Sequence, residues 1–291
     1  MIVVKLMGGL GNQMFQFGAG FALAQKHGVP LHLDLAFLER NPAGAWTKRH
    51  YELGVFGIHP NALEPAQLAR FDATAGPWKR LINRFNPFQK KYVHASEKGQ
   101  SFQPWFHELP ANVYLEGFWQ NEKYFHEVKA ELLKIFTPKP DKPSAIIQLE
   151  KKLFEGTTVS LHVRRGDYVD SKEAGAFHGL CSPEYYAAAI HYLEQRIGPF
   201  SLMVFSDDPE WCAAHFNHPH GQIIVAHAEN AVWDMHLMSL CHHNIIANSS
   251  FSWWGAWLNQ KTDAITVMPR QWFTHQEATE IGINASDWVL L

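Results

Sequence analysis

The feature that most constrains this chain is an alternation of short apolar segments and helical segments in its second half. Strands that alternate with helices form parallel sheets, because a crossover helix must return the chain to the edge from which the next strand starts. The pattern therefore predicts a doubly wound α/β domain. The expected strands span residues 159–163, 202–205, 223–225, 245–247 and 264–268. The expected helices span residues 183–196, with Ser182 as the N-cap, and 231–241, and a further helix opens at Ser249.

The first residues of the chain predict a second α/β arrangement. Residues 2–6 are a β-branched run, a glycine-rich loop follows, and residues 14–24 have apolar side chains at helical spacing before a short strand at 31–34. Strand, loop, helix and strand in this order form a βαβ unit. Further along, we expect a strand at 113–117 and a helix at 121–136, whereas residues 40–110 show only weak periodicity.

Three prolines at positions 138, 140 and 143 interrupt the chain after the expected helix. At roughly 100–200 residues per domain, a chain of 291 residues accommodates two. We therefore expect one domain over residues 1–150 and a second over residues 151–291.

Composition excludes several classes of protein. The formal net charge is −3, so the basic excess of a nucleic-acid binder is missing, and we expect no nucleic-acid partner. Three widely separated cysteines form neither a disulfide framework nor a zinc motif. No apolar run approaches the roughly 20 residues that span a bilayer, and the N-terminus lacks a signal-peptide pattern. We expect a cytoplasmic protein, for which peripheral association with a membrane stays open.

Polar clusters follow the expected strands of the second half at the point where each strand ends. They are His162–Asp167, Ser206–Asp208 and Asn248–Ser252. In open parallel sheets, ligands bind beyond the carboxyl ends of the strands. Each cluster alone has a simpler explanation, a surface ion pair or a helix N-cap. Their shared placement at strand ends favours a binding site.

The residue types in these clusters suit a nucleoside diphosphate. Arg164 and Arg165 carry planar guanidinium groups that bind phosphate oxygens in pairs. A serine-rich helix start offers free N–H groups to an anion. Asp207 or Asp208 could accept hydrogen bonds from a base edge or a ribose. Such a site needs no metal ion, and we predict none.

Other catalytic patterns are missing. Gly8-Gly9-Leu10-Gly11-Asn12-Gln13 does not match the dinucleotide fingerprint, because its third glycine is misplaced. The chain has no nucleophile elbow, no His-Glu-x-x-His helix and no Asp-x-Asp at a strand end. Asn12 and Gln13 are instead uncharged donors and acceptors, which suit a ligand rich in hydroxyl groups.

Five segments together resemble the α-1,2-fucosyltransferases of glycosyltransferase family 11, in their bacterial form. The segment His162-Val163-Arg164-Arg165-Gly166-Asp167-Tyr168 is similar to the basic motif of that family. The other matching segments occur in the family's order and span residues 8–16, 117–125, 205–211 and 248–258.

The resemblance implies a GT-B-type fold, in which two Rossmann-like domains face each other across a cleft. The domain over residues 151–291 would bind GDP-fucose as a co-substrate, without a cofactor, and the domain over residues 1–150 would shape the acceptor site. We expect Arg164, Asp167 and Asn12 to be catalytic, Arg164 and Asn12 by this resemblance and Asp167 as a candidate base. The donor-binding residues are His162, Arg164, Arg165, Asp207, Asp208, Ser249, Ser250, Phe251 and Ser252. We expect the acceptor to meet Asn12, Gln13, Asp34, Glu116, Trp119 and Gln120.

The implied reaction is a metal-independent, inverting transfer of L-fucose from GDP-β-L-fucose to the 2-hydroxyl of a terminal β-galactoside. Asp167, His162, Asp34 and Glu116 are candidates for the general base. Gly9 stands where some protein O-fucosyltransferases carry an arginine, which argues against a protein acceptor. Two alternatives stay open: a carbohydrate-binding protein without catalysis, and a transferase for another GDP-sugar.

Overall fold

The structure is a computed structural model that describes residues 1–40, 48–61, 63, 65–68, 71, 93–166, 172–226, 231–285 and 287–291. The chain forms two compact units, the first ending at Ile135 and the second running from Phe136 to Leu291. Each is built on its own parallel sheet, so the predicted α/β class with two Rossmann-like domains is confirmed. Among the described residues, no helix has both the length and the apolar character needed to cross a membrane.

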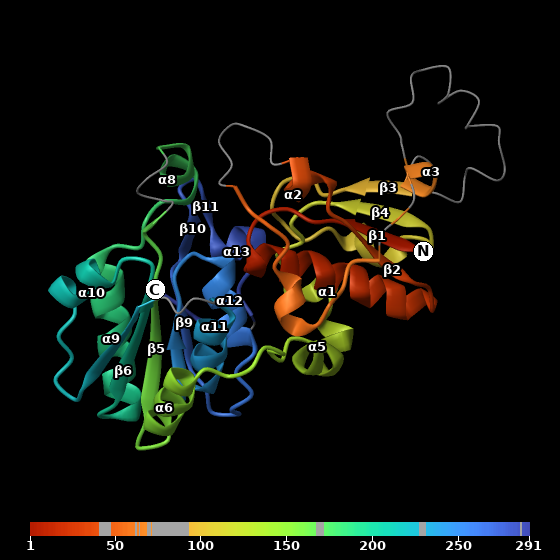
Figure 1. Ribbon diagram of the computed structural model, residues 1–291. Coiled ribbons are helices and arrows are strands. Elements are labelled where there is room, and N and C mark those ends of the chain that lie inside the picture. Colours follow the sequence, from red (N-terminus) through yellow and green to blue (C-terminus); the bar gives the residue numbers. More distant parts are fainter. Residues whose placement is uncertain are drawn as a thin grey trace. The chain divides into compact units, whose positions relative to one another are not determined.

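The first unit contains a four-stranded sheet in the order β2-β1-β4-β3, with every neighbouring pair parallel (Figure 1). The strands are β1 (Ile2–Lys5), β2 (Leu31–Asp34), β3 (Val93–Ser96) and β4 (Val113–Glu116). Strand β3 lies in the part of the sequence where periodicity was too weak to predict an element. Shorter helices of this unit are α2 (Ala36–Arg40), η1 (Leu53–Phe56), α3 (Pro65–Leu68) and η3 (Pro104–Glu108).

Helix α1 (Leu10–His27) covers the sheet of the first unit and is bounded by glycines. Gly8 has a φ of +74° and Gly28 a φ of +60°, values that a residue with a β-carbon rarely adopts. The backbone N–H of Gly28 donates to carbonyls of the last helical turn, and this ends the helix. The helix backbone comes very near β1 at Gly20, which has no side chain to keep the two elements apart.

The single helix expected over residues 121–136 is wrong. The structure has two 3₁₀ turns, η4 (Glu122–Tyr124) and η5 (His126–Val128), followed by the short helix α5 (Lys129–Ile135). Phe125 interrupts them with a φ of −140°, outside the helical range. Its ring is buried, with its centroid 5.9 Å from that of Phe15, so tertiary packing overrides the local helical pattern here.

The second unit contains a six-stranded sheet in the order β12-β9-β8-β5-β6-β7, again with every pair parallel. Counted along the chain from β5, this order is 3-2-1-4-5-6, that of the doubly wound nucleotide-binding fold. The strands are β5 (Thr158–Val163), β6 (Ser201–Ser206), β7 (Gln222–Ala226), β8 (His243–Ile245), β9 (Thr266–Met268) and β12 (Val289–Leu290).

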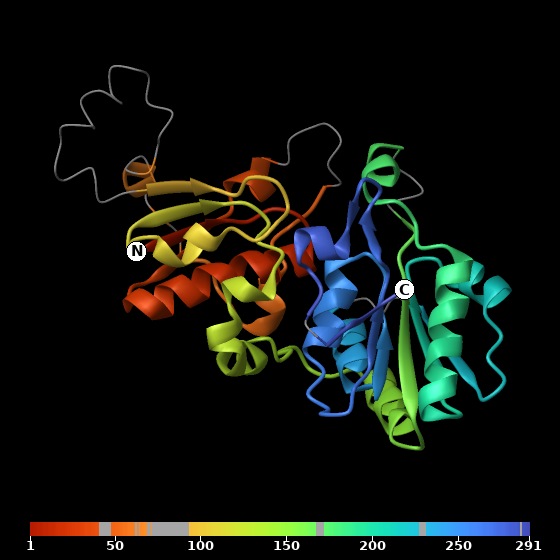
Figure 2. The same cartoon turned by 180° about the vertical axis from the view of Figure 1, so that it is seen from behind.

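Helices lie on both sides of this sheet, with α9 and α10 on one side and α11 and α12 on the other (Figures 1 and 2). Ser182 caps α9 by accepting the N–H of Tyr185 at 3.3 Å, as the sequence predicted. The helices are α6 (Ser144–Leu153), α8 (Lys172–His178), α9 (Pro183–Ile197), α10 (Pro209–His215), α11 (Ala231–Leu240), α12 (Ser250–Trp257) and α13 (Ala278–Ile281). An antiparallel hairpin of β10 (Gln271–Phe273) and β11 (Gln276–Glu277) completes the unit.

The division between the units falls at Ile135 and Phe136, ahead of the boundary expected near residue 150. Helix α6 lies before residue 150 for most of its length, yet it packs against α11 of the second unit. The side chain of Glu150 joins them by accepting from His236 Nε2 at 2.6 Å and from Lys142 Nζ at 2.6 Å. These contacts assign α6 to the second unit.

The close approach of α1 to β1 gives a test of the first unit. A β-carbon at Gly20 would overlap the Val4 side chain and lie 2.9 Å from Leu31 Cδ1. We expect Gly20→Ala to lower the free energy of unfolding by about 1–3 kcal/mol, the cost of overpacking a core. The measurement is the urea midpoint by circular dichroism. Gly156→Ala is the matched control, because a β-carbon there has nothing within 4 Å. Equal midpoints for the two variants would contradict this packing.

Candidate functional site

Three polar segments meet at the carboxyl edge of the second unit's sheet. Strand β5 lies between β6 and β8, with Val163 paired to Ser206 and Leu161 paired to Ile245. The residues that follow these strands therefore lie side by side, as the sequence predicted. The chain leaves β5 towards β6 and β7 and then crosses over to β8. The space between the ends of β5 and β8 is thus the topological switch point, where doubly wound sheets bind nucleotides.

Arg164 follows β5 and is held by Asp207, which follows β6. The distance from Arg164 Nη1 to Asp207 Oδ2 is 2.8 Å, and about a fifth of the Arg164 side chain is exposed, 21%. The other carboxylate oxygen of Asp207 accepts the backbone N–H of Arg165 at 2.9 Å. A β-carbon on Gly166 would lie 2.7 Å from Asp207 Oδ2, so a glycine is needed there. Asp207 therefore fixes both the guanidinium and the backbone of this loop.

Arg165 is engaged with the start of α10. Its Nε donates to Asp208 Oδ2 at 3.0 Å, and its guanidinium carbon lies 4.4 Å from the centre of the Trp211 ring. Asp208 also caps α10 by accepting the N–H of Trp211 at 3.0 Å. This N–H and then Arg165 hold the pKa of the Asp208 carboxyl below its usual value. The two aspartates, expected to meet a nucleoside, are thus first of all partners of the two arginines.

His162 and Phe251 form an aromatic pair beside the switch point. His162 is buried in β5, and its ring centre lies 5.6 Å from that of Phe251, which is half-buried at the start of α12. Tyr186 of α9 donates its O–H to the backbone carbonyl of His162 at 3.1 Å. A histidine buried to this degree supports the site from beneath and is a poor general base for a hydroxyl in solution.

The serines at the start of α12 have different roles. Ser249 is buried and caps the helix by accepting the N–H of Phe251 at 3.3 Å. Ser252 is fully buried, and its hydroxyl donates to the carbonyls of Ala247 and Ser249. Ser252 therefore cannot reach a phosphate, contrary to expectation. Ser250 is half-buried at the first helical position.

Asn248 was expected to belong to this polar cluster, but the structure gives it a structural role. The buried amide nitrogen donates to the carbonyls of His178 at 2.8 Å, Gly179 at 3.2 Å and Trp272 at 3.2 Å. Its oxygen accepts from Cys181 Sγ at 3.4 Å. Asn248 thus fastens the end of α8 and the start of the β10–β11 hairpin to the carboxyl edge of the sheet.

The first unit has a switch point of its own, between β1 and β4. The glycine loop follows β1, and residues 117–120 follow β4. Gln120 Nε2 donates to Asn12 Oδ1 at 2.7 Å, which joins the two loops. Gln16 joins them again, accepting from the N–H of Met7 at 3.0 Å and donating to the carbonyl of Gly117 at 3.2 Å. Asn12 and Gln120, both expected to meet the acceptor, are therefore hydrogen-bonded neighbours.

Two of the expected acceptor residues are buried and cannot present a surface to a ligand. Gln13 is 0% exposed; its amide donates to the carbonyls of Gly8 and His50 and accepts the N–H of Glu52. It ties residues 50–52 to the glycine loop. Trp119 is also 0% exposed and packs in an aromatic core whose other members are Trp105, Phe106 and Tyr124. Neither position was identifiable as buried from sequence, because both follow polar or glycine-rich segments.

Asp34 and Glu116 lie at the ends of β2 and β4 but are already engaged. Asp34 accepts from the O–H of Tyr114 at 2.6 Å and from the N–H of Ala36 at 3.0 Å. Glu116 accepts from Lys5 Nζ at 2.6 Å and lies 2.8 Å from His94 Nε2. The Lys5 hydrogen bond holds the pKa of Glu116 below its usual value. A carboxylate with a lowered pKa is a weak proton acceptor, so Glu116 is a poor candidate for the general base. Asp34 is a poor candidate because two donors already occupy its oxygens.

Glu97, which sequence reasoning missed, holds the loop after β4. Its Oε2 accepts the backbone N–H groups of Phe118 at 2.8 Å and Trp119 at 3.0 Å. Trp119 has a φ of +54°, a left-handed conformation that costs energy for a residue with a side chain. The carboxylate compensates that strain, and burial raises its pKa above the usual value. The sequence signal for this role of Glu97 is its position directly after β3, a strand that the periodicity did not reveal.

The catalytic candidate Asp167 lies outside the described residues. Among the residues that are described, no group of three or more histidine, cysteine, aspartate or glutamate side chains could hold a metal ion.

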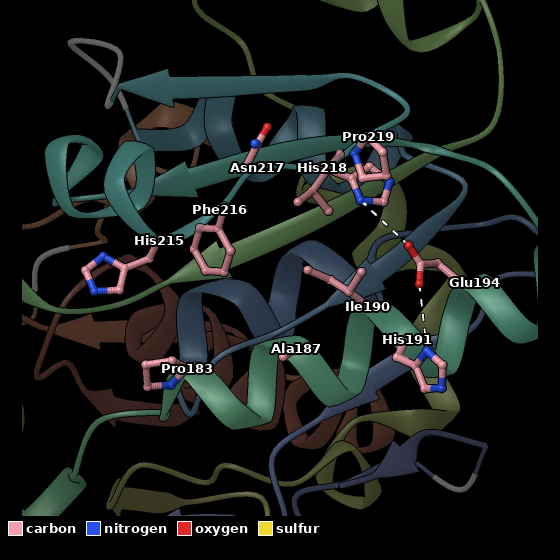
Figure 3. Close-up of a pocket in the computed structure, with 11 residues that line it drawn as sticks. Pro183, Ala187, Ile190, His191, Glu194, His215, Phe216, Asn217, His218 and Pro219 are labelled. Atoms are coloured by element: carbon pink, nitrogen blue, oxygen red, sulfur yellow. Dashed lines mark ion pairs between the residues drawn. The ribbon is translucent and has the colours of Figure 1, made fainter.

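A cavity of about 300 Å³ lies on the flank of the second unit (Figure 3). Its walls come from α9 and from residues 215–219, and Glu194 lies between His191 and His218, 3.9 and 4.0 Å from their Nδ1 atoms. None of the predicted site residues lines it. It is separate from the carboxyl edge, where the arginines and the start of α12 meet.

Comparison with known proteins identifies the family. The model of glycosyl transferase family 11 matches residues 72–291, which include β3, β4 and all of the second unit. The chain belongs to glycosyl transferase family 11. It is therefore a glycosyltransferase of this family, and the resemblance seen in its motifs is confirmed.

Curated relatives agree with this family. The chain is 35% identical to an α-1,2-colitosyltransferase of Escherichia coli, over 99% of this chain and 98% of that protein. It is 32% identical to the O-antigen biosynthesis glycosyltransferase WbnK of Escherichia coli, over 98% and 99%. It is 26% identical to galactoside α-(1,2)-fucosyltransferase 2 of Hylobates lar, over 89% and 69%. The matches to the two Escherichia coli proteins thus cover both units of this chain.

The raised pKa of Glu97 gives a test of the loop after β4. A carboxyl whose pKa is higher in the folded than in the unfolded state contributes stability below its unfolded pKa, and this contribution is lost as pH rises through the folded pKa. Glu97→Gln keeps an oxygen for the two N–H groups and removes the charge. We therefore expect the stability of the variant relative to the wild type to increase as pH rises from the usual carboxyl pKa towards neutrality.

Urea midpoints of both proteins, measured across this pH range, provide the test. Glu108→Gln, a change of the same kind at an exposed position in the first unit, should show no such trend. A constant difference between wild type and Glu97→Gln at all pH values would contradict the assignment.

Proposed function

We propose that this glycosyltransferase moves L-fucose from GDP-β-L-fucose to the 2-hydroxyl of a terminal β-galactoside and inverts the anomeric carbon. The single observation that carries the proposal is the Arg164–Asp207 pair at the switch point of a nucleotide-binding sheet. A guanidinium placed there suits the diphosphate of a nucleotide sugar.

The departing GDP gains negative charge as its bond to the sugar breaks. Arg164 would stabilise that charge, with Asp207 keeping its guanidinium in one orientation. Ser250 and the N–H groups at the start of α12 lie across the switch point and would contribute further donors, aided by the helix dipole. Groups fixed before the reaction stabilise a transition state at little cost in reorganisation. Arg165 would act mainly by supporting the loop, because Asp208 and Trp211 engage it.

The nucleoside would lie beside the aromatic pair of His162 and Phe251. Phe251 is half-buried and offers a ring to the base. Asp207 and Asp208 would accept hydrogen bonds from the base or the ribose only with oxygen lone pairs not used by the arginines. Each of the two aspartates that follow β6 is therefore paired with an arginine before any ligand binds.

The acceptor would meet the uncharged amides of the first unit. Asn12 is half-buried and its oxygen is taken by Gln120, so its amide nitrogen is the group offered to a sugar oxygen. A donor of this kind positions a hydroxyl but does not remove its proton. With Asp34 and Glu116 engaged by other side chains and His162 buried, we propose Asp167 as the general base.

A single displacement converts the β-linked donor into an α-linked product, because attack from the opposite face inverts the anomeric carbon. No covalent intermediate and no metal ion enter this mechanism. The three cysteines are free thiols, which fits the proposed cytoplasmic location. The acceptor glycan would reach the enzyme there, free or presented at a membrane surface with which the enzyme associates peripherally.

A second donor is favoured by one observation. The identity to the α-1,2-colitosyltransferase, 35%, exceeds the identity to the galactoside α-(1,2)-fucosyltransferase, 26%. Colitose is L-fucose without its 3-hydroxyl, so the two donors differ in one polar group. A site that hydrogen-bonds this hydroxyl rejects the deoxy sugar strongly, whereas an apolar site discriminates weakly.

The proposed activity is tested by incubating the protein with GDP-fucose or GDP-colitose and a panel of β-galactosides. We expect transfer from GDP-fucose, with a product that NMR identifies as α-1,2-linked. Preferential transfer from GDP-colitose would replace fucose in the proposal. Binding of galactosides without binding of GDP in calorimetry would instead indicate a carbohydrate-binding protein.

Arg164→Ala should retain the fold and lose turnover, because a donor to the leaving group is missing. The expected decrease in kcat is about 10²- to 10³-fold, the cost of removing one such group. Arg196→Ala is the matched control: Arg196 lies on α9, where its guanidinium carbon is 3.6 Å from the centre of the Tyr192 ring. Steady-state release of GDP, together with circular dichroism of each variant, provides the measurement. Near-normal kcat in a folded Arg164→Ala enzyme would refute the role of Arg164.

A further inference from the structure

Helix α8 and the β10–β11 hairpin lie together at the end of the second unit towards which β5 points (Figure 1). Their aromatic side chains pack against one another. The ring centre of Phe177 on α8 lies 4.7 Å from that of Phe273 and 5.3 Å from that of His275. The ring centre of His178 lies 5.5 Å from that of Phe273. We call these four rings, with Leu180 beside them in the chain, the aromatic platform.

The platform is held in place by hydrogen bonds between the hairpin turn and the end of α8. Thr274 Oγ1 donates to the carbonyl of Ala176 at 2.7 Å, and the N–H of Thr274 donates to the carbonyl of Phe177 at 3.0 Å. Gly179 ends the helix with a φ of +71°, and a β-carbon there would lie 3.2 Å from Thr274 Cγ2. The turn therefore caps α8 and fixes the position of Phe177 before any ligand binds.

Asn248 fixes the platform to the proposed donor site. As described above, its amide nitrogen donates to carbonyls of the α8 end and of Trp272 in β10. The next residue, Ser249, caps α12 at the switch point. A ligand on the platform is therefore positioned relative to the same strand end that would hold the diphosphate.

The platform exposes one apolar ring and one aliphatic side chain. Phe273 is 3% exposed and forms the base, whereas Phe177 is 39% and Leu180 43% exposed. Residues 175–180 and 271–277 contain one charged side chain, Glu277, apart from the histidines. An anionic lipid surface would require lysines or arginines, which these segments lack.

An exposed aromatic ring, in segments with only one charged side chain apart from the histidines, fits the apolar face of a pyranose. We propose that the aromatic platform is a subsite for the acceptor saccharide, which binds the sugar units beyond the galactose that is modified. This inference rests on the proposed transfer to a β-galactoside. It assigns a length preference for the acceptor to the second unit.

The test compares Phe177→Leu, which removes the flat ring but keeps an apolar side chain, with Phe177→Trp, which keeps a ring. Acceptors are methyl β-galactoside and a galactose-terminated tetrasaccharide. We expect Phe177→Leu to raise the KM for the tetrasaccharide about threefold to tenfold, the range for one aromatic contact. The KM for GDP-fucose and kcat should change less than about twofold, and Phe177→Trp should restore the KM for the tetrasaccharide.

Phe154→Leu is the matched control, since Phe154 is 71% exposed at the end of α6 and makes no part of the platform. The subsite would be overturned if Phe177→Leu had the same KM as the wild type for each of the two acceptors. A change in sedimentation coefficient of Phe177→Leu relative to wild type would also overturn it, because such a change would assign the platform to self-association. If the wild type transfers no sugar to either acceptor, the proposed function itself fails, which is a distinct result.

Discussion

The parallel pairing of β5 with β6 on one side and β8 on the other is the constraint on which the proposed site depends. In a parallel sheet all strands end at the same edge, so residues 42 positions apart, such as Arg165 and Asp207, become hydrogen-bonded neighbours. The crossover from β7 to β8 then opens the switch point beside β5. A one-residue change in register would move every side chain to the other face of the sheet and separate Arg164 from Asp207.

At both switch points, polar side chains hold other polar groups through hydrogen bonds and ion pairs. In the second unit, Asp207 fixes Arg164 and the loop backbone, and Asp208 fixes Arg165. In the first unit, Gln120 orients Asn12, while Glu97 supports the strained backbone at Trp119. Such supports hold binding groups in position before a ligand arrives, which lowers the cost of reorganisation. They also account for many polar residues that sequence alone would place in contact with a ligand.

The two switch points differ in charge, and the difference matches the proposed division of labour. The second unit offers guanidinium groups and a helix start, which suit a diphosphate. The first unit offers uncharged amides, while Glu116 is paired with Lys5 and Asp34 accepts a hydrogen bond from Tyr114. Neutral donors suit a sugar hydroxyl, since they bind it without altering its protonation. The aromatic platform adds a surface without charge to the donor-binding unit.

The sequence by itself determined the α/β class, most strand positions and the strand ends at which polar residues gather, because these depend on local periodicity and on the chemistry of neighbouring residues. It also identified the family, through motifs that occur in order. Only the tertiary structure decided which of those residues are buried and which already have partners within the protein. Gln13, Trp119 and Ser252 proved to be buried, Asn248 proved to be an anchor, and Glu97 was not recognised at all. Burial and hydrogen-bond partners arise between residues distant in the chain, so a pattern of nearby residues cannot specify them.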